Sequence, residues 1–234
     1  MIKAPVFLLL VAGLLPAQEQ NPEGDVLCST PDACWKVLVE GNRRWAANPI
    51  ALKHPNQTSA RRNDLANPER KQRPFAVILT CSDSRVPPEL IFDRGLGDLF
   101  VVRLAGNVIG KDVSHDFALA SIQYAVNELK ARLVVVLGHQ RCGAAEAALS
   151  HRTRRPPPPP PLSPPLKALV KAVFPAVDWA RSKWGPKIEV DDVADANVYT
   201  IIRKVEAIVG SDAVKGKRYN LDGNVVDLRE ALVK

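Results

Sequence analysis

Short, continuously apolar runs alternate with helical patterns through the middle of the chain. The runs Phe75–Thr80, Leu99–Arg103 and Leu133–Leu137 are typical of strands buried on both faces of a sheet. Apolar residues recur at helical spacing over 116–130, and another helix is expected to open at 144–149. Strands that alternate with helices of this length predict an α/β fold, doubly wound, with a mostly parallel sheet and flanking helices.

A further helix is predicted ahead of the first strand. Thr30 is a suitable N-cap, Pro31 fits the first helical position, and Asp32 favours the positive end of the helix dipole. An apolar face follows at helical spacing, formed by Cys34, Val37, Leu38 and Trp45. We therefore expect an N-terminal helical arm that begins after Thr30.

An unbroken run of prolines, Pro156–Pro161, separates this central part from the C-terminal part, and Pro164 and Pro165 follow closely. Proline-rich chain adopts an extended polyproline II conformation without internal hydrogen bonds. We interpret residues 156–165 as a stiff surface insertion, with a docking site for an aromatic-lined groove as the alternative. The remaining expected elements are two helices and a turn flanked by short strands, over 166–184, 191–209 and 219–226.

The first residues have the pattern of a secretory signal peptide. Lys3 supplies the positive charge, ten apolar residues follow over Val6–Leu15, and Ala17 is the small residue of a cleavage site. A spanning helix needs about 20 apolar residues, so this segment is too short to cross a bilayer. We expect residues 1–17 to be removed and the protein to be periplasmic or secreted, with a hydrophobic N-terminal strand or helix as the alternative.

Cleavage there leaves an N-terminal linker over 18–29 and a single α/β domain over 30–234. Four cysteines in 234 residues are too few for a disulfide-scaffolded miniprotein. In an oxidising compartment Cys28 and Cys34 either form a local disulfide or remain free thiols, and the sequence leaves both open.

The amino-acid composition excludes several classes of protein. The chain is 46% hydrophobic and 24% charged, which excludes a disordered or collagen-like chain. No apolar run is long enough for a polytopic membrane protein. The net charge of +7 comes from scattered lysines and arginines without interleaved aromatic residues, so we expect a solvated basic surface and no nucleic-acid partner.

Residues with metal-binding chemistry follow two of the predicted strands. Cys81-Ser-Asp-Ser-Arg85 follows the first strand, and His139-Gln-Arg-Cys142 follows the third. The carboxyl ends of parallel strands meet at one edge of a sheet, so both motifs should open there. Cys81, His139 and Cys142 then form a donor set suited to Zn²⁺, with a fourth position open for water, as in catalytic sites. A cysteine nucleophile with His139 as its base is the alternative, but it leaves Cys142 without a role.

The two motifs together resemble the β-class carbonic anhydrases. The resemblance runs from about Ala33 through Arg103-Leu-Ala-Gly-Asn107 to Leu149, and it resumes weakly at Ala196–Val198 and at 219–225. It implies one Zn²⁺ per chain on the three ligands. It also implies reversible hydration of carbon dioxide to bicarbonate and a proton via zinc-bound hydroxide. A related COS or CS₂ hydrolase, or a non-catalytic zinc module closed by Asp83, are the alternatives.

The resemblance also implies roles for four further residues. Asp83 and Arg85 form a catalytic pair, in which Asp83 accepts a hydrogen bond from the hydroxide and Arg85 keeps it ionised and off the metal. Gln72 binds bicarbonate across a dimer interface. Gly106, together with Ala105, leaves room beside the metal for a compact substrate.

The implied assembly is a homodimer or a dimer of dimers, with the N-terminal helix over the partner subunit and no membrane anchor after signal cleavage. Two regions depart from the family, the unusual polyproline insertion and a segment near the C-terminus. The polar segment 211–218 replaces an apolar fifth strand, so the outer edge of the sheet is expected to differ.

Overall fold

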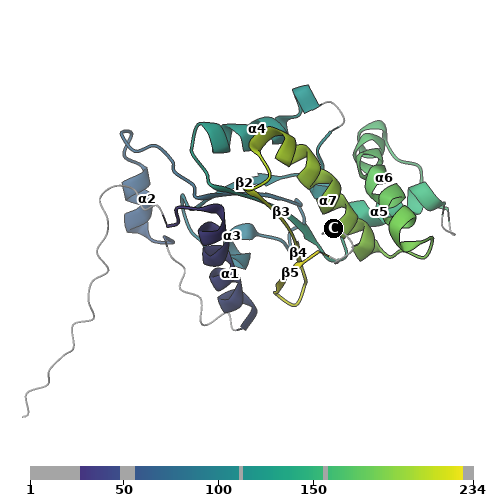
Figure 1. The fold of residues 1–234 in the computed structure, drawn as a ribbon, viewed down its shortest axis with the longest axis horizontal. Helices are drawn as coiled ribbons and strands as arrows, with labels where there is room; N and C mark the ends of the chain where they lie inside the picture. Colours follow the sequence, from purple (N-terminus) through teal and green to yellow (C-terminus); the bar gives the residue numbers. More distant parts are fainter. Residues whose placement is uncertain (1–26, 48–55, 111–112, 155–157, 229–234) are drawn as a thin grey trace, which may run out of the picture.

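A five-stranded sheet in the order β2-β1-β3-β4-β5 forms the centre of the molecule (Figure 1). This computed structural model describes residues 27–47, 56–110, 113–154 and 158–228. The strands are β1 (Ala76–Thr80), β2 (Leu99–Arg103), β3 (Leu133–His139), β4 (Val214–Tyr219) and β5 (Val225–Asp227). Strands β1 to β4 are parallel, and β5 is antiparallel to β4. The predicted α/β fold with a mostly parallel sheet is confirmed.

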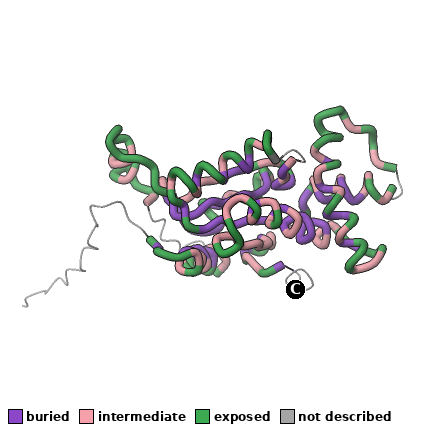
Figure 2. The backbone as a smooth tube through the Cα atoms, turned by 45° about the horizontal axis from the view of Figure 1, so that its top comes forward, coloured by how far each residue is buried: buried purple, intermediate pink, exposed green. Residues whose placement is uncertain are grey.

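Helices cover both faces of the sheet. They are α1 (Pro31–Ala47), α2 (Ser59–Leu65), α3 (Pro88–Ile91), α4 (Phe117–Asn127), α5 (Gly143–Thr153), α6 (Pro164–Trp184) and α7 (Val190–Val209). Alternate residues of β1 and β3 pack against α4 and α7 on one face, and against α1 and α3 on the other. Buried residues therefore follow the strands through the middle of the molecule, and exposed residues lie on the outer sides of the helices (Figure 2).

The N-terminal helix α1 forms as predicted and packs on its own chain. The Thr30 hydroxyl accepts a hydrogen bond from the Ala33 N–H at 3.2 Å, which caps the helix. The buried Asn42 amide donates to the carbonyl oxygens of Ile91 and Gly223, at 3.2 and 2.9 Å. The resemblance implies that this helix covers a partner subunit. One face of the helix packs within the chain, and its placement over a partner subunit stays a prediction.

A disulfide joins Cys28 to Cys34 at the start of α1, with the two Cα atoms 5.0 Å apart. Of the two states that the sequence leaves open, the structure has the bonded one. Cys34 is fully buried against the sheet, so the disulfide attaches the segment before α1 to the core.

Most of the polar segment 211–218 lies in a strand, which corrects the expectation that this segment replaces one. Val214–Tyr219 pairs with β3 through backbone hydrogen bonds, which need no apolar side chains. The charged side chains of the strand have partners: Lys215 pairs with Asp32 at 2.8 Å, and Arg218 pairs with the buried Asp195 at 2.9 Å. The strand is therefore kept by its pairing with two neighbours and by ion pairs.

The proline-rich insertion is shorter than predicted. Pro164 and Pro165 form the first turn of α6, with Ser163 at the N-cap position. Proline fits there because the first amide groups of a helix have no partner within the helix and its fixed φ is already helical. Residues 158–163 have no regular secondary structure, whereas 155–157 lie outside the described residues.

The expected signal peptide, residues 1–17, and most of the expected linker also lie outside the described residues. Within the described part of the chain, no helix is both long enough and apolar enough to cross a membrane.

Candidate metal centre

Three potential metal ligands lie together at the carboxyl ends of β1 and β3. Cys81 directly follows β1, His139 is the last residue of β3, and Cys142 occupies the N-cap position of α5. Their two sulfur atoms and one imidazole nitrogen all lie within 4.8 Å of one another, and all three side chains are buried. β1 and β3 are in register, so their ends are adjacent. The two sequence motifs meet at one sheet edge, as predicted.

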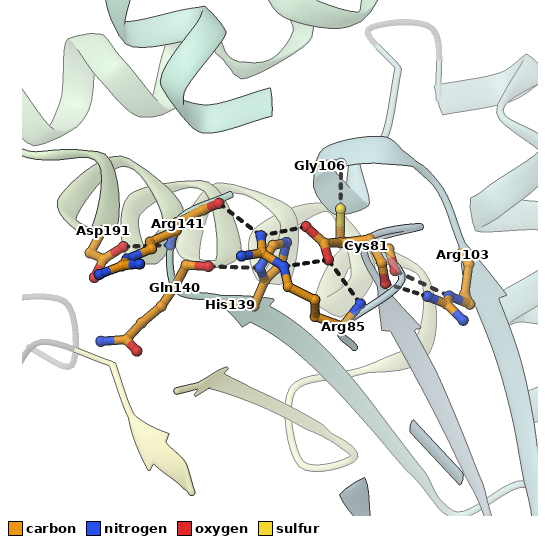
Figure 3. A network of polar contacts seen from close by, with 9 residues as sticks. Cys81, Arg85, Arg103, Gly106, His139, Gln140, Arg141 and Asp191 are labelled. Atoms are coloured by element: carbon orange, nitrogen blue, oxygen red, sulfur yellow. Dashed lines mark hydrogen bonds and ion pairs between the residues drawn. The ribbon is translucent and has the colours of Figure 1, made fainter. Parts of the chain in front are cut away.

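The imidazole of His139 has one nitrogen free for a metal. Its Nδ1 lies 2.9 Å from the carbonyl oxygen of Gln140 (Figure 3). A carbonyl can only accept, so Nδ1 carries a proton, and in the neutral ring the lone pair is then on Nε2. Nε2 is buried and has no hydrogen-bond partner. A buried polar atom without a partner costs about 1–3 kcal/mol, and coordination of a metal would satisfy it.

The two thiols contact each other and differ in how readily they ionise. Cys142 donates a hydrogen bond to Cys81, which lowers the pKa of Cys81 against the opposing effect of burial. The same hydrogen bond, together with burial, raises the pKa of Cys142. The N–H of Gly106 also donates to Cys81 Sγ, at 3.1 Å. Cys81 is therefore the more readily ionised of the two thiols, and a divalent cation bound by both would favour the thiolate form of each.

The turn that carries His139 and Cys142 is held from both sides. Arg141 has a positive φ of 52°. Its N–H donates to Asp191 Oδ1 at 2.8 Å, and its carbonyl oxygen accepts from Arg85 Nη2 at 3.2 Å. Sequence analysis missed Asp191, because an acidic residue in the first turn of a helix ordinarily serves the helix dipole.

Asp83 and Arg85 form a two-point ion pair beside Cys81. Arg85 Nε lies 2.9 Å from Asp83 Oδ1, and Nη2 lies 2.7 Å from Oδ2. The backbone N–H of Arg85 donates to the same carboxylate at 2.9 Å. These bonds hold the pKa of Asp83 well below its usual range and raise the pKa of Arg85. Arg103 holds the backbone beneath the pair by donating to the carbonyl oxygens of Cys81 and Asp83, at 3.1 and 2.7 Å.

Of the two predicted substrate-binding residues, Gly106 lies beside the ligand group and Gln72 does not. Gly106 is buried next to Cys81, and its N–H donates a hydrogen bond to the sulfur. Gln72 is exposed and precedes β1, so it lies toward the amino end of the strand whose carboxyl end carries Cys81. Gln72 is therefore not brought to the ligand group of its own chain.

Sequence comparison identifies relatives over most of the chain. A sequence model of the carbonic anhydrase family matches residues 76–233. A carbonic anhydrase of Mycolicibacterium smegmatis is 39% identical over 212 residues, covering 87% of this chain and 96% of the relative. Carbonic anhydrase 2 of Mycobacterium tuberculosis is 51% identical over 122 residues, covering 52% of this chain and 54% of the relative.

Solved structures have the same fold. A β-carbonic anhydrase of Coccomyxa, in complex with acetazolamide, aligns with a TM-score of 0.59 at 25% identity, covering 82% of this chain and 84% of the other. One of two tetrameric β-carbonic anhydrases of Sordaria macrospora aligns with a TM-score of 0.57 at 26% identity, covering 72% and 88%. With the buried Cys₂His group and the matched sequence motifs, these findings show that the chain belongs to the β-class of the carbonic anhydrase family.

Proposed function

We propose that this carbonic anhydrase works through one zinc ion held by Cys81, His139 and Cys142. Its reaction is the reversible hydration of carbon dioxide to bicarbonate and a proton. The observation that carries the zinc assignment is the buried ligand group itself, in which two cysteine sulfurs and a His139 ring nitrogen lie within 4.8 Å of one another and Nε2 has no hydrogen-bond partner.

The donor set fits zinc. Two sulfurs and one imidazole nitrogen are ligands that Zn²⁺ prefers, and three protein ligands leave the fourth tetrahedral position open to solvent or substrate. Zinc bound there supplies a Lewis acid that lowers the pKa of a water molecule and so provides a nucleophile for carbon dioxide near neutral pH.

Asp83 and Arg85 orient the water molecule that attacks carbon dioxide. The Asp83 carboxylate is ionised, so its oxygens accept a hydrogen bond from the attacking water and orient its lone pair toward carbon dioxide. Arg85 holds that carboxylate in place with three hydrogen bonds and bonds the Arg141 carbonyl as well. It therefore links the Cys81 loop to the His139–Cys142 turn.

Removal of zinc tests this function. We expect stopped-flow carbon dioxide hydration to fall to the uncatalysed rate when a chelator strips the protein, and to return when zinc is added back. Full activity in protein that holds almost no metal would contradict the proposal. Turnover of COS or CS₂ without carbon dioxide hydration would favour the related hydrolase, and zinc binding without any turnover would favour a non-catalytic zinc module.

The proposed location is the periplasm or the extracellular medium. A charged residue, a ten-residue apolar segment and a small residue occur in signal-peptide order over 1–17. The Cys28–Cys34 disulfide supports this location, because disulfides persist mainly in oxidising compartments.

The proposed assembly is a homodimer, alone or paired into a tetramer. β2 lies at one edge of the described sheet, and an open edge invites pairing with another chain. Apolar side chains accompany this edge: Phe100 is half-buried and contacts Tyr124, which is 48% exposed. A cavity of about 580 Å³ at the start of β2 is lined partly by the exposed Leu90 and Leu96. The binding of bicarbonate by Gln72 across the interface, implied by the family resemblance, is part of this proposal.

One native mass spectrum of protein recovered from producing cells tests both location and assembly. We expect a subunit that begins near Gln18, retains the Cys28–Cys34 disulfide and forms dimers or tetramers. Intact Met1 on protein from the cytosolic fraction would rule out export. A monomer at micromolar concentration would rule out the proposed dimer.

A further inference from the structure

A residue of α7 that the reaction does not use reaches one of the metal ligands through a single glycine. Asn197 is buried, 4% exposed, and its amide Nδ2 donates to the Gly106 carbonyl oxygen at 2.8 Å. The N–H of the same glycine donates to Cys81 Sγ at 3.1 Å (Figure 3). We propose that Asn197 is a positioning residue for the Cys81 sulfur ligand and acts through the backbone of Gly106.

Gly106 needs such an external restraint. Its φ of 69° is in the left-handed region, and a Cβ at this position would lie 2.7 Å from the Cβ of Ala144. The position therefore requires glycine, which is also the residue whose backbone rotates most freely. Rotation here would turn the N–H away from sulfur. The hydrogen bond from Asn197 to the adjoining carbonyl holds the N–H in the direction that reaches Cys81.

The close packing of α7 on the sheet places Asn197 within reach. A Cβ at Gly138 would lie 2.5 Å from the neighbouring Val198 side chain, and one at Gly216 would lie 3.1 Å from it. Because both positions are glycine, the helix lies directly on β3 and β4. Asn197 is thereby fixed by the packing of its own helix rather than by the loop that it restrains.

The same helix restrains the same loop at a second place, which provides a matched control. Lys204 Nζ donates to the carbonyl oxygens of Ile109 and Gly110, both at 2.9 Å. Lys204 and Asn197 are separated by two helical turns, so they lie on the same side of α7. Of these two residues, only Asn197 donates to Gly106, the glycine whose N–H donates to Cys81.

The inference rests on the proposed zinc centre and concerns the stability of its Cys81 bond. An N–H donated to a thiolate stabilises its charge and orients its lone pairs toward the metal. Loss of hydrogen-bond partners just outside a metal's ligands typically weakens metal binding by about 10- to 100-fold. We expect a loss of that size when Asn197 can no longer donate.

The test compares Asn197→Leu, which keeps a similar size but has no donor, with Lys204→Met. Zinc affinity is measured by competition with a chelator, and the cobalt-substituted proteins are compared by their sulfur-to-metal charge-transfer absorption. The expected result is that N197L binds zinc about 10- to 100-fold more weakly and shifts the charge-transfer band. K204M is expected to keep both properties of the unaltered protein, even where it lowers the melting temperature.

Two results would overturn the inference: unchanged affinity and spectrum in N197L, or the same losses in K204M as in N197L. If N197L does not fold, Asn197→Asp replaces it as the test variant, because it keeps the side-chain size while its ionised form cannot donate.

A further test uses the unaltered protein loaded with an NMR-active cadmium isotope. The Gly106 amide proton should couple to the metal through the hydrogen bond, and absence of that coupling also overturns the inference. Failure of the unaltered protein to bind zinc, or binding that survives Cys81→Ala, would instead refute the zinc centre.

Discussion

Substituting alanine for Cys81, His139 or Cys142 is expected to remove zinc from the protein and to lower carbon dioxide hydration by about 10³-fold or more. Removal of one donor from a group of three leaves too few ligands to hold the ion. Zinc per chain and stopped-flow hydration are measured on the same preparations.

Cys34→Ser is the matched control for these variants, since Cys34 is also a buried cysteine but lies outside the ligand group. It opens a disulfide whose cysteines are 6 residues apart, so the free energy of unfolding should fall by about 2 kcal/mol. Below its melting temperature it should keep one zinc per chain and its activity. The ligand assignment would be wrong if a variant lacking both Cys81 and Cys142 kept full metal and full activity.

Arg85→Ala is expected to lower kcat/KM by about 10²-fold while zinc stays bound. The substitution removes all the side-chain bonds that hold the Asp83 carboxylate in place. The pKa of Asp83 then rises toward its ordinary value, although the carboxyl group remains ionised at neutral pH. The loss of activity should therefore persist across the neutral range, because a carboxylate out of position, not a protonated one, causes it.

Arg152→Ala controls for the loss of an exposed arginine in the same pairing geometry. Arg152 makes two bonds to Asp178, at 2.7 and 2.8 Å, between α5 and α6. The Arg152→Ala variant should keep the activity of the unaltered protein. Equal activity losses in the two variants, or unchanged activity in Arg85→Ala, would remove Arg85 from the reaction.

The sequence predicted the central strands well because their burial leaves a strong local signal. β1 and β3 are buried at every position, and apolar residues run without a break over 76–79 and 133–137. β4 carries no such signal, since Lys215, Lys217 and Arg218 keep their charges in ion pairs. Its existence depends on backbone pairing with β3, which is distant in the sequence, as well as with the nearby β5. The boundary at Pro164 was missed for a related reason: proline is compatible with both an extended segment and the first turn of a helix.

The sequence by itself determined which residues can bind a metal, because thiol, imidazole and carboxylate groups carry their chemistry in the residue type. Only the tertiary structure decided what supports them. Asn197 bonds Gly106 across 91 residues, and Asp191 bonds Arg141 across 50. In both contacts one of the two partners is a backbone group, and every residue except proline offers the same N–H and C=O. Such a contact therefore cannot be predicted from the pattern of residue types. It is found only in the folded structure, in which the helix and the loop lie together.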